Sequence, residues 1–441
     1  MTHELDGILM SVAQTGFNRR LADFRRRVLA AGRFAAFGSQ EAATLAAVHR
    51  AIIERGDAAV AEFTERFDKV VLSPERFRVS KQALAEAHAS CDAALLAAVR
   101  KAIANVREYQ QRIFVGRRSD ESGATGIRYT PIRRVGVCVP GAAAPLPSTV
   151  IMTAVPAQVA GAEEIAVVSP PRHQGTIHPV ILAVCHELGL EEVYRIGGAQ
   201  AVFALAEGTA TIAKVDKIVG PGNKWVQAAK KIVSGNTVGI DSIAGPSEVL
   251  IIADSRANPA WVAADMLSQA EHGTDSSAIV VTDSDATARA ILAELKRQVS
   301  QLSRSAEAGS SLATCGRIIV VADLNAAVKL ADEFATEHLE VQCGDRSRSV
   351  AAKVRNAGAI FIGPYTPVAV GDYWAGPSHT LPTGMTARFA SALTSNDFVK
   401  SISLIEYDRD GLAAAADDII RLAETEGLDA HARSVRIRRE G

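Results

Sequence analysis

The feature that most constrains the fold is an alternation of short β-branched segments with alanine-rich helical segments, which begins near residue 127. The first β-branched segments cover residues 135–139, 164–168, 192–196 and 217–219, and proline or glycine follows each of them closely. A second series covers residues 249–253, 278–282, 317–321, 340–341 and 359–362. Because strands that alternate with helices form βαβ units, the pattern predicts an α/β fold with parallel sheets between helical layers.

The two ends of the chain lack this alternation and have a helical pattern. Residues 38–112 carry apolar side chains at helical spacing, which predicts a helix-rich opening. Residues 411–441 combine a helical pattern with a polar end, and we interpret them as an ordered tail. A length of 441 residues is enough for about three compact units.

Charge and cysteine usage exclude some classes of function. The 48 basic and 49 acidic residues leave a net charge of -1, so no global basic field favours a nucleic-acid partner. The five cysteines are scattered without CxxC spacing, which predicts reduced thiols. No basic leader precedes an apolar segment, and no apolar run approaches the roughly 18 residues of a membrane helix. We therefore expect a cytoplasmic protein with no membrane partner.

Two glycine-containing turns follow predicted strands. They are RIGGAQA at residues 195–201 and VGPGNKW at residues 219–225. Either turn alone is explained by a tight connection that needs glycine, and neither matches GxGxxG. The helix that RIGGAQA opens would favour a phosphate at its N-terminus. Together the two turns mark adjacent carboxyl ends of parallel strands, where open α/β sheets bind ligands.

Histidines near acidic or amide side chains are the candidates for chemistry. Gln269 and His272 lie three residues apart in a predicted helix and share one face, although local evidence alone favours a surface glutamine and a dipole-stabilised histidine. Glu337 and His338 are adjacent, a combination that serves general-base catalysis and water activation but also occurs in solvated turns.

The remaining candidates lie toward the carboxyl end. Asp372 and His379 flank an aromatic, glycine-containing loop that could equally be a structural crossover, and His431 follows Glu426 closely. One amide, one carboxylate and two imidazoles would suit Zn²⁺ with open positions for substrate; these groups belong to Gln269, His272, Asp372 and His431. Spacing alone leaves open whether the four side chains converge.

Ordered motifs across nearly the whole chain resemble the histidinol dehydrogenase family. They include RIGGAQA, IDSIAGPSE, SQAEH, EHLE and GDYWAGPSHTLPT. The resemblance implies the zinc-dependent, four-electron oxidation of L-histidinol to L-histidine through L-histidinal, with reduction of two NAD. These are the last steps of histidine biosynthesis.

The resemblance also implies residue roles. It assigns one zinc ion per subunit to Gln269, His272, Asp372 and His431, and the catalytic roles to Glu337 and His338. His338 would be the general base, and Glu337 would activate the water that hydrates the aldehyde. NAD contacts would come from Cys138, Gln200 and Asn223. The substrate would meet the zinc ligands, His338 and a further set of side chains: Ser247, His379 and Glu426.

Family likeness further implies two Rossmann-like domains and a homodimer with shared active sites. We expect a helical arm at residues 1–35 and a first α/β domain, carrying the metal and catalytic residues, that combines residues 36–130 with 245–385. Residues 131–244 would form the NAD-binding domain. Residues 386–441 would form a dimerisation tail that completes the partner subunit's site.

Four positions depart from the usual family pattern: Cys138, Ala142, Glu207 and Ser378. They affect expected cofactor contacts more than the metal or the catalytic pair. A paralogue that oxidises another amino or sulfonated alcohol is the nearest alternative. A zinc hydrolase that uses Glu337 and His338 on water, or a non-catalytic binding protein, is the alternative from another class.

Overall fold

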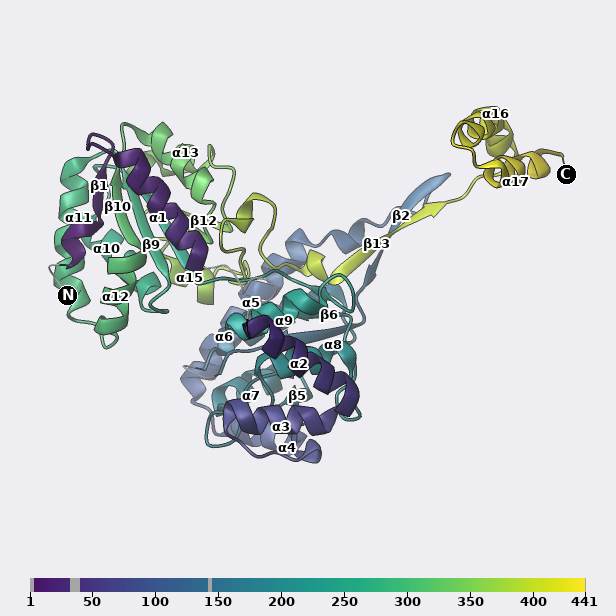
Figure 1. The fold of residues 1–441 in the computed structure, drawn as a ribbon, viewed down its shortest axis with the longest axis horizontal. Coiled ribbons are helices and arrows are strands. Elements are labelled where there is room, and N and C mark those ends of the chain that lie inside the picture. The colour runs from purple at the N-terminus through teal and green to yellow at the C-terminus, as the bar shows by residue number, and fades with distance from the viewer. Residues whose placement is uncertain (1–3, 32–39, 142–144, 441) are drawn as a thin grey trace.

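Two parallel sheets organise the molecule (Figure 1), which confirms the α/β class predicted from the alternating segments. The structure is a computed structural model that describes residues 4–31, 40–141 and 145–440. Ala142, one of the four departures, lies outside these residues.

The smaller parallel sheet has five strands. In spatial order they are β5 (Glu192–Tyr194), β4 (Glu164–Val168), β3 (Arg134–Cys138), β6 (Lys217–Val219) and β7 (Gly239–Ile240). Its own helices cover both faces, α6 (Pro147–Ala160) and α7 (Pro179–Glu187) on one side, and α8 (Gly198–Glu207) and α9 (Lys224–Val233) on the other.

The larger parallel sheet has six strands. Their order is β1 (Leu9–Ser11), β10 (Gly316–Val320), β9 (Ser277–Thr282), β8 (Glu248–Ala253), β11 (His338–Gln342) and β12 (Ala359–Ile362). One face packs against α10 (Pro259–Ala270), α11 (Asp285–Val299) and α12 (Ser305–Cys315). The other packs against α1 (Phe17–Ala31), α13 (Leu324–Phe334) and α14 (Ser347–Ala351).

Burial on both faces explains the apolar strand sequences. Strands β3, β8, β9 and β11 are buried at every position, as expected for parallel strands between two helical layers. The exceptions to this apolar pattern in β8 and β11 are four buried polar residues, Glu248, His338, Glu340 and Gln342, and the first three of them are ionisable. Since a buried charge is costly unless it is paired, these positions call for a specific explanation.

The N-terminal helices pack on the smaller sheet, not on the larger one. They are α2 (Gln40–Arg55), α3 (Asp57–Asp68), α4 (Lys81–Ala89) and α5 (Ala93–Ile113), and their apolar faces join the two cores of the five-stranded sheet. The expected division grouped residues 36–130 with 245–385, and it is corrected here. Conversely, the part of the predicted arm that the structure describes, residues 4–31, belongs to the larger domain, because β1 pairs with β10 and Leu5 and Ile8 lie in its core.

An antiparallel ribbon carries the C-terminal helices away from the body. Strand β2 (Thr125–Pro131) pairs with β13 (Val399–Ile405), and α16 (Arg409–Thr425) and α17 (Asp429–Glu440) form a hairpin at its far end (Figure 1). The hairpin has its own small apolar cluster, which includes Ala416, Ile420 and Ala432. It therefore forms a separate unit beyond the two sheets.

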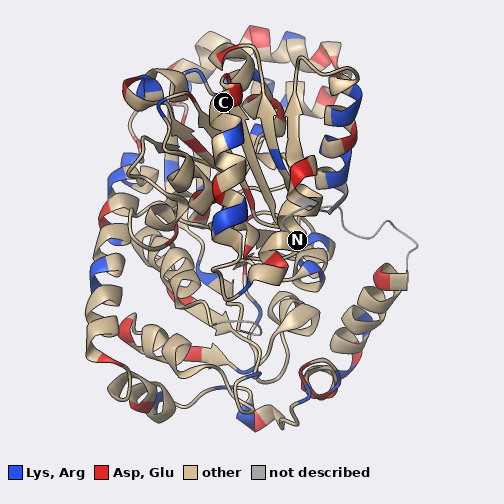
Figure 2. Cartoon of the chain, turned by 90° about the vertical axis from the view of Figure 1, so that its left-hand side faces the viewer, with Lys and Arg blue, Asp and Glu red and all other residues tan. Residues whose placement is uncertain are grey.

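Short elements complete the fold. They are α15 (Val368–Tyr373) and the 3-10 helices Glu4–Ile8, Pro74–Arg76, Val115–Arg118, Gly344–Arg346, Thr386–Arg388 and Ser395–Phe398. Acidic and basic residues are interspersed along the outer helices (Figure 2), in keeping with the near-zero net charge. Among the described helices, none combines the length and the hydropathy needed to cross a membrane.

Candidate active site

A cleft of about 700 Å³ lies between the two sheets. Its lining includes four of the residues singled out from the sequence: Asn223, Ser247, His272 and Glu337. Asn223 follows β6, whereas Ser247 and Glu337 immediately precede β8 and β11. The carboxyl-terminal end of the smaller sheet thus faces the amino-terminal end of the larger one across this cleft.

Glu337 and His338 are buried at the start of β11, with 7% and 4% of their surfaces exposed. His338 Nδ1 lies 3.0 Å from the Glu248 carbonyl oxygen, which can only accept, so Nδ1 carries a proton. His338 Nε2 has no hydrogen-bond partner among the described residues and lies 3.7 Å from Asp372 Oδ1. This nitrogen is therefore the one available to a ligand.

The pair's pKa values reflect burial and mutual attraction. Burial raises the pKa of Glu337 to about 7, although His338 opposes the shift. Burial by itself would lower the pKa of His338, but Glu337 and Asp372 outweigh it and raise the value to about 9. Both groups are thus perturbed toward neutral or alkaline pH, as is common for residues that move protons.

Glu248 forms hydrogen bonds with both members of this pair. The Glu248 N–H donates to Glu337 Oε2 at 2.9 Å, and the Glu337 N–H donates to Glu248 Oε2 at 3.4 Å. Glu248 Oε1 accepts from the Gly384 N–H at 3.0 Å. Burial, with the Glu337 carboxyl, raises the pKa of Glu248 to about 8. The sequence analysis missed Glu248, although an acidic residue that opens an apolar strand was a usable signal.

His338, Asp372 and His379 line a second, smaller cavity of about 120 Å³. Burial lowers the pKa of His379 and of His272, so both imidazoles favour the neutral form. For Asp372, burial would raise the pKa, but His338 outweighs it and lowers the value. Neutral imidazole and ionised carboxylate are the forms that bind a divalent metal.

The candidate metal ligands of one chain fit a zinc site in their chemistry. Gln269 is buried on α10 one turn before His272, and the charge of Asp372 acts on the His272 ring. Among the described residues, no group of three or more His, Cys, Asp or Glu side chains could hold a metal. The chemical fit therefore rests on the donor types that Gln269, His272 and Asp372 offer.

Two of the expected site residues are not brought to the cleft by this chain. Glu426 and His431 are exposed in the hairpin of α16 and α17, at the far end of the ribbon (Figure 1). Neither residue lines the cleft of its own chain. The candidates that a single chain does bring to the cleft and the second cavity are Asn223, Ser247, His272, Glu337, His338, Asp372 and His379.

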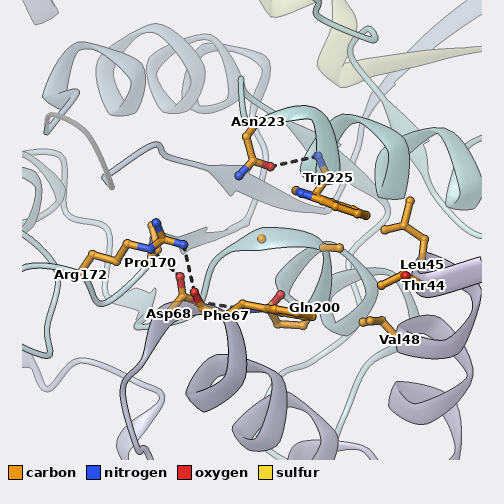
Figure 3. Close-up of a pocket in the computed structure, with 12 residues that line it drawn as sticks. Thr44, Leu45, Val48, Phe67, Asp68, Pro170, Arg172, Gln200, Asn223 and Trp225 are labelled. Carbon is orange, nitrogen blue, oxygen red and sulfur yellow. Dashed lines mark hydrogen bonds and ion pairs between the residues drawn. The ribbon is translucent and has the colours of Figure 1, made fainter. Parts of the chain in front are cut away.

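Gln200 and Asn223 line a third cavity, of about 320 Å³ (Figure 3). Asn223 caps α9, because its Oδ1 accepts from the N–H groups of Trp225 and Val226 at 3.1 and 3.2 Å. Asn223 and Trp225 line both this cavity and the large cleft, so the two volumes adjoin. An elongated ligand could extend from one into the other.

The amide of Gln200 is held by a buried carboxylate. Gln200 Nε2 donates to Asp68 Oδ2 at 3.2 Å, and Arg172 Nε donates to Asp68 Oδ1 at 2.8 Å (Figure 3). Asp68, Arg172 and Trp225 escaped the sequence analysis. The first two lie in unrelated segments with no motif, whereas Trp225 is one of only three tryptophans and ends the VGPGNKW turn.

Three of the four residues that depart from the usual family pattern, Cys138, Glu207 and Ser378, are described by the structure, and they lie in different parts of the fold. The Cys138 side chain is buried in the core, lines neither the cleft nor the third cavity, and has its pKa raised by burial to about 12. Glu207 Oε1 pairs with His49 Nε2 at 2.8 Å. Ser378 donates from Oγ to the Met152 carbonyl at 3.0 Å and so anchors the residue before His379.

The fold and the cleft define an α/β protein with a buried Glu–His pair between two parallel sheets. The family model for histidinol dehydrogenase matches residues 35–439. A histidinol dehydrogenase from Rhodopirellula baltica is 48% identical over 390 residues, covering 88% of this chain and 84% of that protein. One from Bradyrhizobium diazoefficiens is 46% identical over 428 residues, covering 96% and 98%.

A solved structure of a histidinol dehydrogenase also matches this chain. Histidinol dehydrogenase from Elizabethkingia anophelis superposes with a TM-score of 0.88 at 33% identity, covering 98% of this chain and 97% of that one. This chain belongs to the histidinol dehydrogenase family.

Proposed function

We propose that the protein oxidises L-histidinol to L-histidine through L-histidinal, using two NAD and one zinc ion per subunit. The observation that carries the proposal is the cleft in which Asn223, Ser247, His272 and Glu337 surround one volume, with His338 and Asp372 beside it. The names of the relatives supply the substrate, and the cleft supplies groups suited to each step.

Zinc would be held by Gln269, His272 and Asp372 of one chain and His431 of a second copy. This set offers nitrogen and oxygen donors, which suits a zinc site that keeps room for a ligand. When bound, the ion would supply an anchor for the substrate's imidazole and amine. Ser247, His379 and, from the second copy, Glu426 would orient the rest of the substrate.

In the first oxidation, His338 would accept the hydroxyl proton through Nε2 once its imidazole is deprotonated, which its raised pKa of about 9 favours at alkaline pH. Bound NAD would supply the acceptor for the hydride that leaves the carbinol carbon, and the products would be the aldehyde and NADH. In the second, Glu337 accepts a proton from a water whose oxygen adds to the aldehyde carbon. The resulting hydrate transfers its hydride to a second NAD and leaves as the carboxylate. Both electron pairs thus end on NADH.

NAD would extend from the third cavity into the large cleft. Gln200 and Asn223 line the third cavity, and Asn223 lies where it adjoins the cleft that contains Glu337. The expected contact from Cys138 would have to involve its backbone, because the thiol lies in the core.

The position of the tail supports a homodimer with shared sites. Apolar side chains on the ribbon and hairpin are exposed in the single chain, among them Ile405 at 76%, Leu422 at 66% and Ile437 at 60%. Exposed apolar surface of this kind favours contact with a second copy, and an extended terminal element favours exchange between copies.

The state of the cysteines supports the expected cytoplasmic location. Cys91 and the four buried cysteines are all free thiols, as is usual in a reducing compartment.

The test is NADH formation by the purified chain, followed by absorbance, with histidinol and a sulfonated diol offered separately. We expect two NADH per histidinol, loss of activity after chelation and recovery on adding Zn²⁺. Faster turnover of the diol would assign the chain to a paralogous activity. Absence of NADH with every alcohol would refute the dehydrogenase and favour a hydrolase.

A further inference from the structure

A buried pair of carboxyl groups lies near the candidate site, on two of the elements that carry its residues. Asp265 is on α10, and Glu340 is on β11 with only 1% of its surface exposed. The amide nitrogen of Gln342 donates to Asp265 Oδ2 and to Glu340 Oε2, at 2.8 Å in both cases. The two carboxyl groups therefore share one amide donor.

The alternation of β11 explains this placement. Side chains two residues apart point to the same face of a strand, so His338, Glu340 and Gln342 all face the α10 side. Leu339 and Val341 belong to the core on the opposite side. A polar stripe therefore runs along one buried face of β11, from the catalytic histidine to the carboxyl pair.

The pair connects three elements that carry candidate zinc or catalytic residues. On α10, Asp265 precedes Gln269 by about one turn. On β11, Glu340 lies two residues after His338. Glu340 Oε1 also accepts from the Val368 N–H at 3.2 Å, at the start of α15, the helix that ends next to Asp372.

Within the described ranges, neither Asp265 nor Glu340 has an ion-pair partner, and no cation is among the main causes of either group's pKa shift. The other titratable side chains on the three elements are His338, Asp372 and Tyr373, and none of them contacts the pair. Burial raises the pKa of Glu340 well above the ordinary glutamic acid value, and Asp265 adds to this shift. Two carboxyl groups so placed cannot both ionise at low cost.

We propose that Asp265 and Glu340 share one proton and act as a positioning pair that holds α10, β11 and α15 in the arrangement the zinc ligands require. The inference rests on the proposed zinc site. It adds residues that touch neither metal nor substrate and act through the backbone elements that bear the ligands. Outer groups of this kind commonly set metal affinity.

The experiment measures transfer of zinc from the full-length holoenzyme to a colorimetric chelator, at about pH 7 and about pH 10. The variants are Glu340→Gln, which replaces the protonated acid by a neutral isostere, and Asp265→Ala, which removes the partner. Asp254→Asn is the matched control, because Asp254 is a fully buried carboxylate at the other end of the same sheet. Thermal unfolding of each variant is recorded in parallel.

We expect Asp265→Ala to release zinc about 10 to 100 times faster than the unchanged chain at neutral pH. Release from the unchanged chain should accelerate by about tenfold or more at alkaline pH, because each pH unit multiplies the ionised fraction of a weak acid by about ten. Glu340→Gln should retain zinc at both pH values, and Asp254→Asn should follow the unchanged chain.

Two results would overturn the inference without touching the proposed function: equal release rates for Asp265→Ala and the unchanged chain, or the same alkaline acceleration in Glu340→Gln. A lower Tm with unchanged zinc release would assign the pair to stability alone. If the unchanged chain bound no zinc under any condition, the zinc site itself would fall, and the positioning role with it.

Discussion

Replacing Lys230 by methionine should destabilise the smaller domain strongly. Lys230 lies on α9 with 1% of its surface exposed, and it pairs with the Asp241 carboxylate, whose side chain is 3% exposed. Lys230 Nζ also donates to the Gly220 carbonyl oxygen at 3.0 Å. Through these contacts Lys230 links the glycine turn at Gly220 to Asp241, in the segment that leads into the larger sheet.

The magnitude follows from what the substitution leaves behind. Methionine fills much of the lysine volume, so the main loss is the charge that compensates Asp241. Breaking a buried ion pair from one side costs about 3–5 kcal/mol of unfolding free energy. The lower end applies here, because Asp241 still accepts from the N–H groups of Gly220 and Ser242, both at 2.7 Å.

The assay is urea unfolding near neutral pH, with KM for NAD measured on the folded protein. We expect the double variant Lys230→Met/Asp241→Asn to recover much of the loss, since it removes the unpaired charge. Lys224→Met is the matched control on the same helix, where the pair with Glu41 is exposed and contributes about 0–1 kcal/mol. A cost below about 1 kcal/mol for Lys230→Met, or a double variant no more stable than the single one, would refute the reasoning.

Three further outcomes are expected. Glu337→Gln should slow the oxidation of histidinal much more than that of histidinol, because only the second oxidation needs an activated water; equal losses in single-turnover kinetics would remove that role. His431→Ala should lower the zinc content measured by atomic absorption, and unchanged stoichiometry would exclude it as a ligand. Because the pKa of Glu248 is raised to about 8, its stabilising effect is complete below the ordinary pKa of about 4.3 and is lost as pH rises to about 8. Glu248→Gln should flatten that decline in urea titrations across pH, and a parallel decline in both proteins would contradict it.

The strands were predictable because a parallel sheet covered on both faces demands continuous apolar segments. Residues 164–168 and 217–219 were expected as strands and form β4 and β6 with the same bounds. The glycine turns were also placed correctly at strand ends. The division into domains was less accessible, because the apolar face of α2 or α5 does not specify which of two sheets it will cover.

Residues of the candidate site could be predicted from the sequence only where they lie within one short motif. Gln269 and His272 were expected on one helix face; α10 ends at Ala270 and His272 lies in the turn that follows, where its N–H donates to the Gln269 carbonyl at 3.2 Å, so their proximity still follows from local geometry. The burial of Glu337 depends on the contact between β11 and β8, which brings residues about ninety positions apart together and has no local signal. The use of the amino-terminal edge of the larger sheet was equally hidden, because the general rule for α/β sheets points to the opposite edge.

The ribbon of β2 and β13 has a consequence for genetics and for assay design. In the proposed dimer, a lesion in the hairpin damages the neighbour's site, whereas a lesion in the body damages its own. A chain altered at His431 and a chain altered at Glu337, each inactive alone, would therefore complement when mixed and allowed to exchange subunits. Every mixed pair would contain one site with both defects and one site with neither.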